Sequence, residues 1–427
     1  MNIVKYPEKS TWKSLCERAT INENTLQDKV QAILEDVKLN GDQALSKYAA
    51  LFDKVTINRF EVSKEEIAQA SALVSAELQS AIQLAKQNIE AFHASQKEKE
   101  NKVTTTTGVT CWRKSVAIEK VGLYIPGGSA PLFSTILMLG IPAKLAGCGE
   151  IVLCTPPDKE GNVNPAILYT ASLVGITKVF KVGGAQAIGA MAYGTETIPN
   201  VYKILGPGNQ FVTKAKEFIQ QQGVAIDMPA GPSEVLVIAD ETANPAFVAA
   251  DLLSQAEHGA DSQAVLVTTK EEVAEAVVQE VLEQLDKLPR KETAKKALEN
   301  SFVVVLNSSE ESINFSNVYA PEHLIIASEN AYSYIEKITN AGSVFLGNYS
   351  CESAGDYASG TNHTLPTNGY AKNYSGVSLD SFVKKITFQE VTQQGIATIG
   401  NAIEVMAAAE GLDAHKNAVT LRLKSLQ

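Results

Sequence analysis

The residues best suited to acid–base or metal chemistry in this sequence are its histidines. There are five of them, at positions His93, His258, His323, His363 and His415. Imidazole titrates near neutral pH and is the commonest side-chain ligand for transition metals. All except His93 lie near acidic, amide or glycine residues at the expected ends of helices or strands. Because four of the five have such neighbours, we favour a common site for them. His93 falls in a charged helical region, and we expect it at the surface.

Gln255 and His258 are spaced one helical turn apart. Their helix is expected to have Asn244 as its N-cap, Pro245 at its first position and Gly259 just after its end. On one face of the last turn, an amide oxygen and an imidazole nitrogen could bind the same metal ion. Alternatively, the histidine only stabilises the helix C-terminus. The spacing alone favours this second interpretation, because Gln-x-x-His is a common pattern.

A carboxylate and an imidazole are adjacent at Glu322-His323, directly after Pro321. Such a pair suits general acid–base catalysis. Neighbouring residues of an extended strand point to opposite faces, so the two side chains share a site only if the backbone turns there. The proline makes such a turn plausible. The alternative is an exposed strand end.

The elements that must position these residues follow a repeating pattern from residue 116 onward. Strands are expected at 119–125, 150–154, 178–182, 202–205 and 234–239, with helices at 131–146, 165–174, 185–193 and 210–221. Further strands are expected near 264–267, 303–306, 324–326 and 344–346, again separated by helices. Parallel strands need crossovers of this length. The pattern therefore predicts an α/β fold with two doubly wound, incompletely Rossmann-like domains.

The flanking regions are different in character. A helix is expected from Thr25, capped by Asn24 and ended by Gly41, and a second helical run from 63 to about 99. Residues 348–379 are rich in Gly, Asn, Ser and Tyr without a clear period, which is typical of a functional loop. The tail is predicted to form a short strand from 382 and helices at 394–409 and 413–424.

Glycine-rich turns follow three strands of the first series. They are Gly127-Gly128-Ser129, Gly183-Gly184 and Gly206-Pro207-Gly208-Asn209. Each lies between a strand and a helix, where backbone N–H groups can receive phosphate or hydroxyl oxygens. The complete GxGxxG dinucleotide fingerprint is absent. Three such turns at one edge of one sheet nevertheless predict a nucleotide crevice.

Composition excludes several classes of protein. The chain has 427 residues, 45% hydrophobic and 20% charged, with a net charge of −11. We expect no nucleic-acid binding, since there is no basic patch, and no membrane span or signal peptide, since no apolar run is long enough. Five cysteines without a CxxC pair indicate a reducing, cytoplasmic location. Cys111, Cys148 and Cys154 could hold an aldehyde covalently, but we expect buried structural thiols.

Several longer motifs resemble those of the histidinol dehydrogenase family. They are VGLYIPGG at 121–128, GGAQAI at 183–188, GPGN at 206–209, DMPAGPSE at 227–234, QAEH at 255–258 and YAPEHL at 319–324. Residues 355–357, 360–363, 410–412 and 415 also match. The resemblance implies a zinc-dependent, NAD-linked alcohol and aldehyde dehydrogenase. Such an enzyme makes the four-electron oxidation of L-histidinol to L-histidine, the last step of histidine biosynthesis, through bound L-histidinaldehyde.

The resemblance also assigns site residues. The catalytic acid–base pair is Glu322 and His323. The ligands of one Zn²⁺ per subunit, which also meet the substrate, are Gln255, His258, Asp356 and His415. NAD contacts are Tyr124, Gln186 and Asn209, and further substrate contacts are Ser233, His323, His363 and Glu410.

The domain plan implied by the resemblance has four parts. Residues 1–22 are an N-terminal extension, and 23–123 together with 234–378 form a domain carrying most of the zinc and substrate site. Residues 124–233 form the NAD-binding domain, and 379–427 a C-terminal segment for homodimerisation. Glu410 and His415 are then expected to complete the partner's site. Two alternatives stay open: a related dehydrogenase for another small polar alcohol, and a non-catalytic protein that kept the fold.

Overall fold

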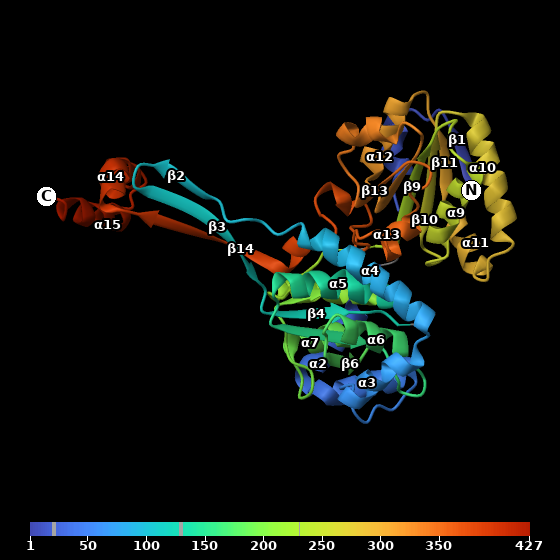
Figure 1. Cartoon of the computed structure of the whole chain (residues 1–427), viewed down its shortest axis with the longest axis horizontal. Helices are drawn as coiled ribbons and strands as arrows, with labels where there is room; N and C mark the ends of the chain where they lie inside the picture. Colours follow the sequence, from blue (N-terminus) through green and yellow to red (C-terminus); the bar gives the residue numbers. More distant parts are fainter. Residues whose placement is uncertain (19–22, 128–130, 230) are drawn as a thin grey trace.

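Two α/β bodies and one long arm make up the molecule (Figure 1). The computed structural model describes residues 1–18, 23–127, 131–229 and 231–427. Gly128 and Ser129, part of the first predicted glycine turn, lie outside the described residues, as does Ala230. No helix in the described ranges combines the length and apolar character that a membrane crossing needs.

A five-stranded parallel sheet organises the first body. Its strands are β4 (Lys120–Tyr124), β5 (Glu150–Thr155), β6 (Lys178–Lys181), β7 (Lys203–Leu205) and β8 (Ala225–Ile226), in the order β6-β5-β4-β7-β8. The connecting helices are α5 (Phe133–Ala146), α6 (Pro165–Leu173), α7 (Gly184–Tyr193) and α8 (Gln210–Gln221). Helix α5 is buried at every position from Ser134 to Ala143, because it is enclosed by neighbouring elements on all sides.

A six-stranded parallel sheet organises the second body. Its strands are β1 (Asn2–Lys5), β9 (Glu234–Ala239), β10 (Gln263–Thr268), β11 (Phe302–Val305), β12 (His323–Ala327) and β13 (Ser343–Leu346), in the order β1-β11-β10-β9-β12-β13. The helices are α9 (Pro245–Ala256), α10 (Glu271–Leu285), α11 (Lys291–Glu299) and α12 (Ser309–Tyr319). Strands β9, β10 and β12 are buried throughout, which explains their continuous apolar sequences.

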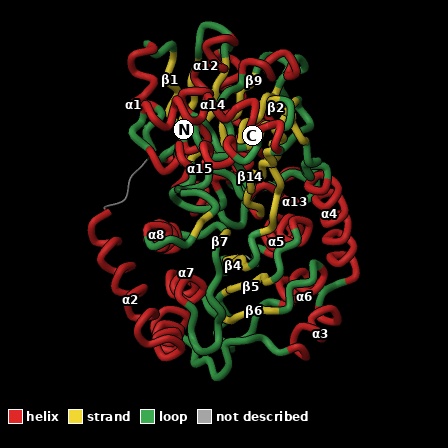
Figure 2. Tube along the Cα trace, turned by 90° about the vertical axis from the view of Figure 1, so that its left-hand side faces the viewer, coloured by secondary structure: helices red, strands yellow, loops and turns green. Residues whose placement is uncertain are grey.

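The N-terminal helices cover the five-stranded sheet. They are α2 (Glu23–Tyr48), α3 (Lys64–Leu73) and α4 (Ala76–Ala94), and they contact α7, α6 and α5 respectively. The predicted grouping of residues 23–123 with 234–378 is therefore wrong, because these helices pack on the other body (Figure 2). Residues 1–22 are more than an extension, since β1 pairs with β11 at the edge of the six-stranded sheet. Helical periodicity identifies an apolar face but not which sheet it covers.

Two predicted helix borders also differ. Gly41 has a φ of 49° and a ψ of −129°, and the helix resumes after it, so this residue makes a kink in α2 rather than its end. The run predicted from 63 to 99 is two helices, because Ser75 starts α4 by accepting a hydrogen bond from the Leu78 N–H.

The arm is an antiparallel sheet followed by two helices. Strands β2 (Lys102–Thr106), β3 (Val109–Ala117) and β14 (Val383–Val391) pair in the order β14-β3-β2. Helices α14 (Gln393–Ala409) and α15 (Asp413–Lys424) pack together at its far end (Figure 1). The tail helices agree with the sequence prediction, whereas the hairpin of β2 and β3 was not predicted.

The remaining elements are short. They are α1 (Trp12–Leu15), α13 (Glu352–Tyr357), a π-helical turn at Ala49–Asp53 and 3-10 turns at Lys9–Thr11, Ala331–Lys337, Tyr370–Lys372 and Leu379–Phe382. Helix α13 interrupts the long segment that the sequence predicts as a loop, and it contacts α9.

Candidate active site

The glycine turns at 183–184 and 206–209 lie with Gly127 at the carboxyl edge of the five-stranded sheet, as predicted for these residues. The chain leaves β4 toward β5 on one side, and β7 lies on the other, so a crevice is expected outside the ends of β4 and β7. Tyr124 at the end of β4 joins the other two turns, because its hydroxyl accepts a hydrogen bond from Gly184 N–H at 3.0 Å. Gly206 has a φ of +138°, and a Cβ there would lie 2.1 Å from the Tyr124 carbonyl oxygen. Only glycine fits this position.

The three predicted cofactor contacts lie at this edge. Tyr124 is buried, and burial raises its pKa to about 12, so its hydroxyl keeps a proton to donate. Gln186 is buried in the first turn of α7. Asn209 caps α8, with its Oδ1 accepting hydrogen bonds from Phe211 and Val212 N–H at 3.0 and 3.2 Å. Its exposed amide nitrogen is available as a donor.

The acid–base pair lies at the amino edge of the six-stranded sheet. Residues 227–233 lead from the carboxyl end of β8 to the amino end of β9, so the described parts of this connection bring the two edges together. His323 begins β12, opposite Val235 of β9. Ser233 and Glu234 stand at the start of β9. The predicted substrate contact Ser233 is therefore in the same row of strand ends as His323.

Glu322 and His323 both face the backbone of Glu234. The Glu322 Oε2 accepts a hydrogen bond from Glu234 N–H at 2.8 Å and lies 3.8 Å from His323 Nδ1. His323 Nδ1 lies 3.3 Å from the Glu234 carbonyl oxygen. The chain turns just before the pair, where Ala320 has a φ of 55°. The requirement that the backbone turn beside Pro321 is thus met, and the exposed-strand alternative is wrong, because both side chains are buried.

Burial and neighbouring carboxylates perturb both groups. Burial raises the pKa of Glu322 to about 8. Burial lowers the pKa of His323, but the nearby carboxylates, Glu352 foremost, outweigh it and raise that pKa to about 10. Perturbations of this size on a buried pair are common at catalytic sites.

A cluster suited to a metal ion adjoins His323. One ligand atom each of His258, Glu352 and Asp356 lies within 4.8 Å of the other two. Asp356 Oδ1 is 3.5 Å from His323 Nε2. Nearby in α9, Gln255 is completely buried, and neither polar atom of its amide has a hydrogen-bond partner within the described structure. Buried, unpaired oxygen and nitrogen atoms are costly unless something binds them, so this donor set fits a cation.

Glu352 is a residue that the sequence analysis missed. It lies one turn before Asp356 in α13, and its Oε2 is buried without a hydrogen-bond partner among the described residues. The signal was the spacing Glu-x-x-x-Asp, which places both carboxylates on one helical face. It was hidden in a segment where no helix was expected.

Helix α9 begins as predicted and ends earlier. Asn244 Oδ1 accepts the Ala246 N–H at 3.0 Å, and Pro245 occupies the first position. The helix ends at Ala256 with Glu257 as C-cap. His258 therefore lies in the following turn, where its N–H donates to the Gln255 carbonyl at 3.2 Å. Gly259 does not have the left-handed conformation expected of it.

His363 joins the two bodies. Its Nδ1 lies 3.0 Å from the Asp356 carbonyl oxygen, and its Nε2 lies 3.1 Å from Thr135 Oγ1 in α5. Next to it, Asn362 Nδ2 donates to the Met138 carbonyl at 2.6 Å and lies 3.3 Å from His93 Nε2. The prediction that His93 lies at the surface is wrong, because the packing of α4 against this distant segment buries it completely.

The last two predicted site residues lie elsewhere in the chain. Glu410 ends α14 and His415 is in the first turn of α15, and both are exposed on the arm, remote from α13 (Figure 1). A single chain thus brings His258 and Asp356 together with Glu352, with Gln255 in the turn just before His258, but it does not bring them together with His415.

Burial disfavours the thiolate form of the buried cysteines. All five are free. Burial raises the pKa of Cys148 to about 11 and that of Cys154 still further above its usual range. This confirms the prediction of buried structural thiols for these two, whereas Cys111 on β3 is only half-buried.

A parallel α/β fold, with helix-opening glycine turns at one sheet edge and a buried acid–base pair at another, is typical of an α/β enzyme that binds a nucleotide. The model of the family described as histidinol dehydrogenase matches residues 16–423. The chain belongs to the histidinol dehydrogenase family.

Individual relatives agree with this family. The chain is 62% identical over 427 residues to a histidinol dehydrogenase of Bacteroides thetaiotaomicron, covering 100% of both. It matches the crystal structure of histidinol dehydrogenase from Elizabethkingia anophelis with a TM-score of 0.98 and 63% identity, covering 100% of this chain and 98% of that one. An acetylating aldehyde dehydrogenase from Geobacillus thermoglucosidasius shares the fold alone, at 15% identity, a TM-score of 0.50 and coverage of 89% and 94%.

Proposed function

We propose that this protein oxidises L-histidinol to L-histidine with NAD⁺, removing four electrons in two steps at one site. Family membership over nearly the whole chain supports the overall reaction. The observation that carries the site assignment is the placement of Glu322 and His323 on the Glu234 backbone, beside the cluster of His258 and Asp356.

The metal of the proposed site is zinc. Gln255, His258 and Asp356 would hold it together with His415 of a second chain, and Glu352 is close enough to the same point to contribute. When bound, zinc would attract the imidazole and amine nitrogens of histidinol and so orient the alcohol carbon. Buried polar atoms of Gln255, Glu352 and Asp356 support this assignment, since each lacks a hydrogen bond within the described structure.

The protein's own groups move the protons. His323 accepts the hydroxyl proton as hydride leaves the alcohol carbon for NAD⁺. Glu322 then takes a proton from water as the water oxygen adds to the aldehyde carbon, and protonated His323 returns its proton to the aldehyde oxygen to give the hydrate. His323 is then free to accept a proton from the hydrate as the second hydride leaves for a second NAD⁺. The Glu234 backbone fixes both side chains during these steps. Ser233, His363 and Glu410 are proposed to contact the polar groups of the substrate.

Tyr124, Gln186 and Asn209 are proposed to contact the cofactor. They lie at the sheet edge where the two fully described glycine turns, 183–184 and 206–209, are found, and each can offer a hydroxyl or amide group.

The active unit is proposed to be a homodimer in which the arm of one chain completes the site of the other. Glu410 and His415 lie on the arm, away from the remaining site residues of their own chain. The arm also exposes large apolar side chains, among them Val405 at 61%, Met406 at 65% and Leu421 at 58%. Exposed apolar surface of this extent is typical of an interface.

The decisive experiment measures NADH formed per histidinol consumed, before and after chelation. We expect two NADH per substrate, loss of activity on chelation and recovery with zinc. Comparison with simple amino alcohols tests the alternative of another polar substrate, and equal rates with those alcohols would contradict the proposal. No NADH from any of them would instead favour a non-catalytic protein.

A further inference from the structure

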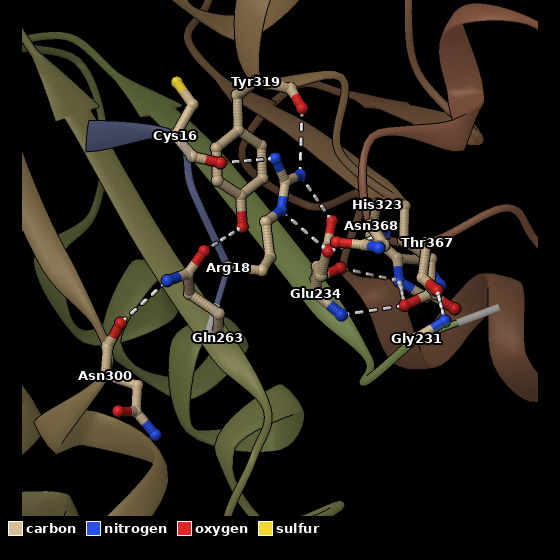
Figure 3. Close-up of polar contacts among 11 residues, drawn as sticks. Cys16, Arg18, Gly231, Glu234, Gln263, Asn300, Tyr319, His323, Thr367 and Asn368 are labelled. Carbon is tan, nitrogen blue, oxygen red and sulfur yellow. Dashed lines mark hydrogen bonds and ion pairs between the residues drawn. The ribbon is translucent and has the colours of Figure 1, made fainter. Parts of the chain in front are cut away.

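A buried ion pair lies behind the acid–base pair, between Arg18 and Glu234 (Figure 3). Arg18 Nε donates to Glu234 Oε1 at 2.9 Å, and a terminal nitrogen donates to Oε2 at 2.8 Å. The side chains are only 10% and 1% exposed. A two-point contact of this kind fixes a carboxylate in orientation as well as in position.

Arg18 is itself held on several sides. Its guanidinium lies over the Tyr319 ring, 3.7 Å from the centroid, and donates to the carbonyl oxygens of Cys16 at 2.8 Å and Tyr319 at 2.9 Å. The Tyr319 hydroxyl in turn donates to Gln263 Oε1 at 2.7 Å. Tyr319 ends the helix that leads into Glu322, so Arg18 is attached both to Glu234 and to the segment carrying the catalytic pair.

Glu234 connects this ion pair to the catalytic side chains through its backbone. Its N–H donates to Glu322, and its carbonyl oxygen faces His323 Nδ1. Its carboxylate also accepts the Asn368 N–H at 2.7 Å. The orientation of one peptide therefore sets the positions of both catalytic groups, and the side chain of the same residue is fixed by Arg18.

We propose that Arg18 and Glu234 are positioning residues, whose ion pair holds the Glu234 backbone in the orientation that aligns Glu322 and His323 for reaction. The inference rests on the proposed catalytic roles of that pair. Stability alone explains the arrangement less well, because well-packed apolar residues often serve as well as a buried ion pair. Through this ion pair the N-terminal segment supports the catalytic site, in addition to supplying strand β1.

The test uses Arg18→Met and Arg18→Lys, each in the natural chain and in a Glu322→Gln background, with the aldehyde half-reaction as readout. A displacement of about 1 Å of a catalytic group can lower a rate about 100-fold. We expect Arg18→Met to lower kcat for L-histidinaldehyde oxidation by this order, with KM for NAD⁺ nearly unchanged. Arg18→Lys keeps the positive charge but loses the two-point contact, so its kcat should lie between those of the natural protein and Arg18→Met.

The Glu322→Gln background separates positioning from general structural damage. If Arg18 acts through Glu322, Arg18→Met should cause little further loss once Glu322 is disabled. The proposal would be overturned if the double variant lost the product of the two single-variant losses in kcat. It would also be overturned if Arg18→Met kept the kcat of the natural protein. Where Arg18→Met does not fold, Arg18→Lys carries the same comparison.

The matched control is Lys5→Met. Lys5 lies in β1, at the other end of the N-terminal segment, and makes an exposed ion pair with Glu271 at 2.5 Å. Its loss should leave kcat unchanged. If Glu322→Gln alone oxidises the aldehyde at the natural rate, the catalytic assignment fails, and that result is distinct from a failure of Arg18 to affect a catalytic Glu322.

Discussion

The two parallel sheets share one strand order and are used at opposite edges. When the extra edge strand β1 is left out, β6-β5-β4-β7-β8 and β11-β10-β9-β12-β13 are both ordered third, second, first, fourth, fifth along the chain. The five-stranded sheet presents its glycine turns at the carboxyl edge, where ligands of open α/β sheets usually bind. The six-stranded sheet instead contributes Glu322 and His323 from the amino edge.

The difference follows from how the chain passes between the sheets. The short connection at 227–233 runs from a carboxyl end to an amino end, so these are the edges that face each other. At the carboxyl edge of the six-stranded sheet, polar side chains bond to neighbouring turns: Asp240 accepts the Thr242 N–H at 2.9 Å, and Thr242 Oγ1 accepts the Glu329 N–H at 3.0 Å. Strand order alone therefore does not decide where a site forms.

The largest expected effect is at the amino edge of the six-stranded sheet. Glu322→Gln should lower aldehyde oxidation by about 1000-fold, because a general base typically contributes a factor of 100 to 10,000. The first equivalent of NADH should still form, which a single-turnover measurement can detect. Asp240→Asn, at the opposite, carboxyl edge of the same sheet, is the control and should turn over normally. Full four-electron turnover by Glu322→Gln would refute the assignment.

A somewhat smaller effect is expected where the amino edge meets the metal cluster. Glu352→Gln keeps the shape of the side chain and removes one negative charge from the group of His258 and Asp356. We expect about 10- to 100-fold weaker zinc retention, the range found when groups around a metal are altered. Zinc content after dialysis against a chelator measures it. Retention equal to that of the natural protein would remove Glu352 from the metal site.

At the carboxyl edge of the five-stranded sheet, the expected effect concerns the cofactor only. Asn209→Asp preserves the helix cap, because aspartate caps equally well, but loses the amide donor and adds a charge that repels phosphate. KM for NAD⁺ should rise about tenfold for about 1.4 kcal/mol of lost binding. Thermal stability and zinc content should not change. An unaltered KM would place the cofactor elsewhere.

The smallest of the expected effects is a partial recovery of activity when two inactive variants are mixed. His415→Ala and His258→Ala each lack one proposed ligand, and a mixed dimer would contain one complete site if the arm serves the partner. Some activity should therefore return on co-refolding, with assembly followed by light scattering. Refolding each variant alone is the control. No recovery from a confirmed mixed dimer would mean that sites lie within one chain.

The sequence predicts the local features well and the long-range ones less so. Strands from 119 to 346 and helix caps such as Asn244 follow from nearby residues, and the structure has them. Which sheet α2 to α4 cover, and the burial of His93 against Asn362, depend on contacts between distant segments. Arg18 has no sequence signal of this kind, because its partner Glu234 is separated from it by most of the first body.

The arm has a practical implication for protein engineering. Strand β3 is central in its sheet, with β14 on one side and β2 on the other. Truncating the chain before Val383 would remove β14, the neighbour of β3 on one side. It would leave a two-stranded ribbon whose backbone amide and carbonyl groups on that side have no partner. Such shortened chains should self-associate, whereas a purification tag attached after Gln427 would leave β3 paired on both sides.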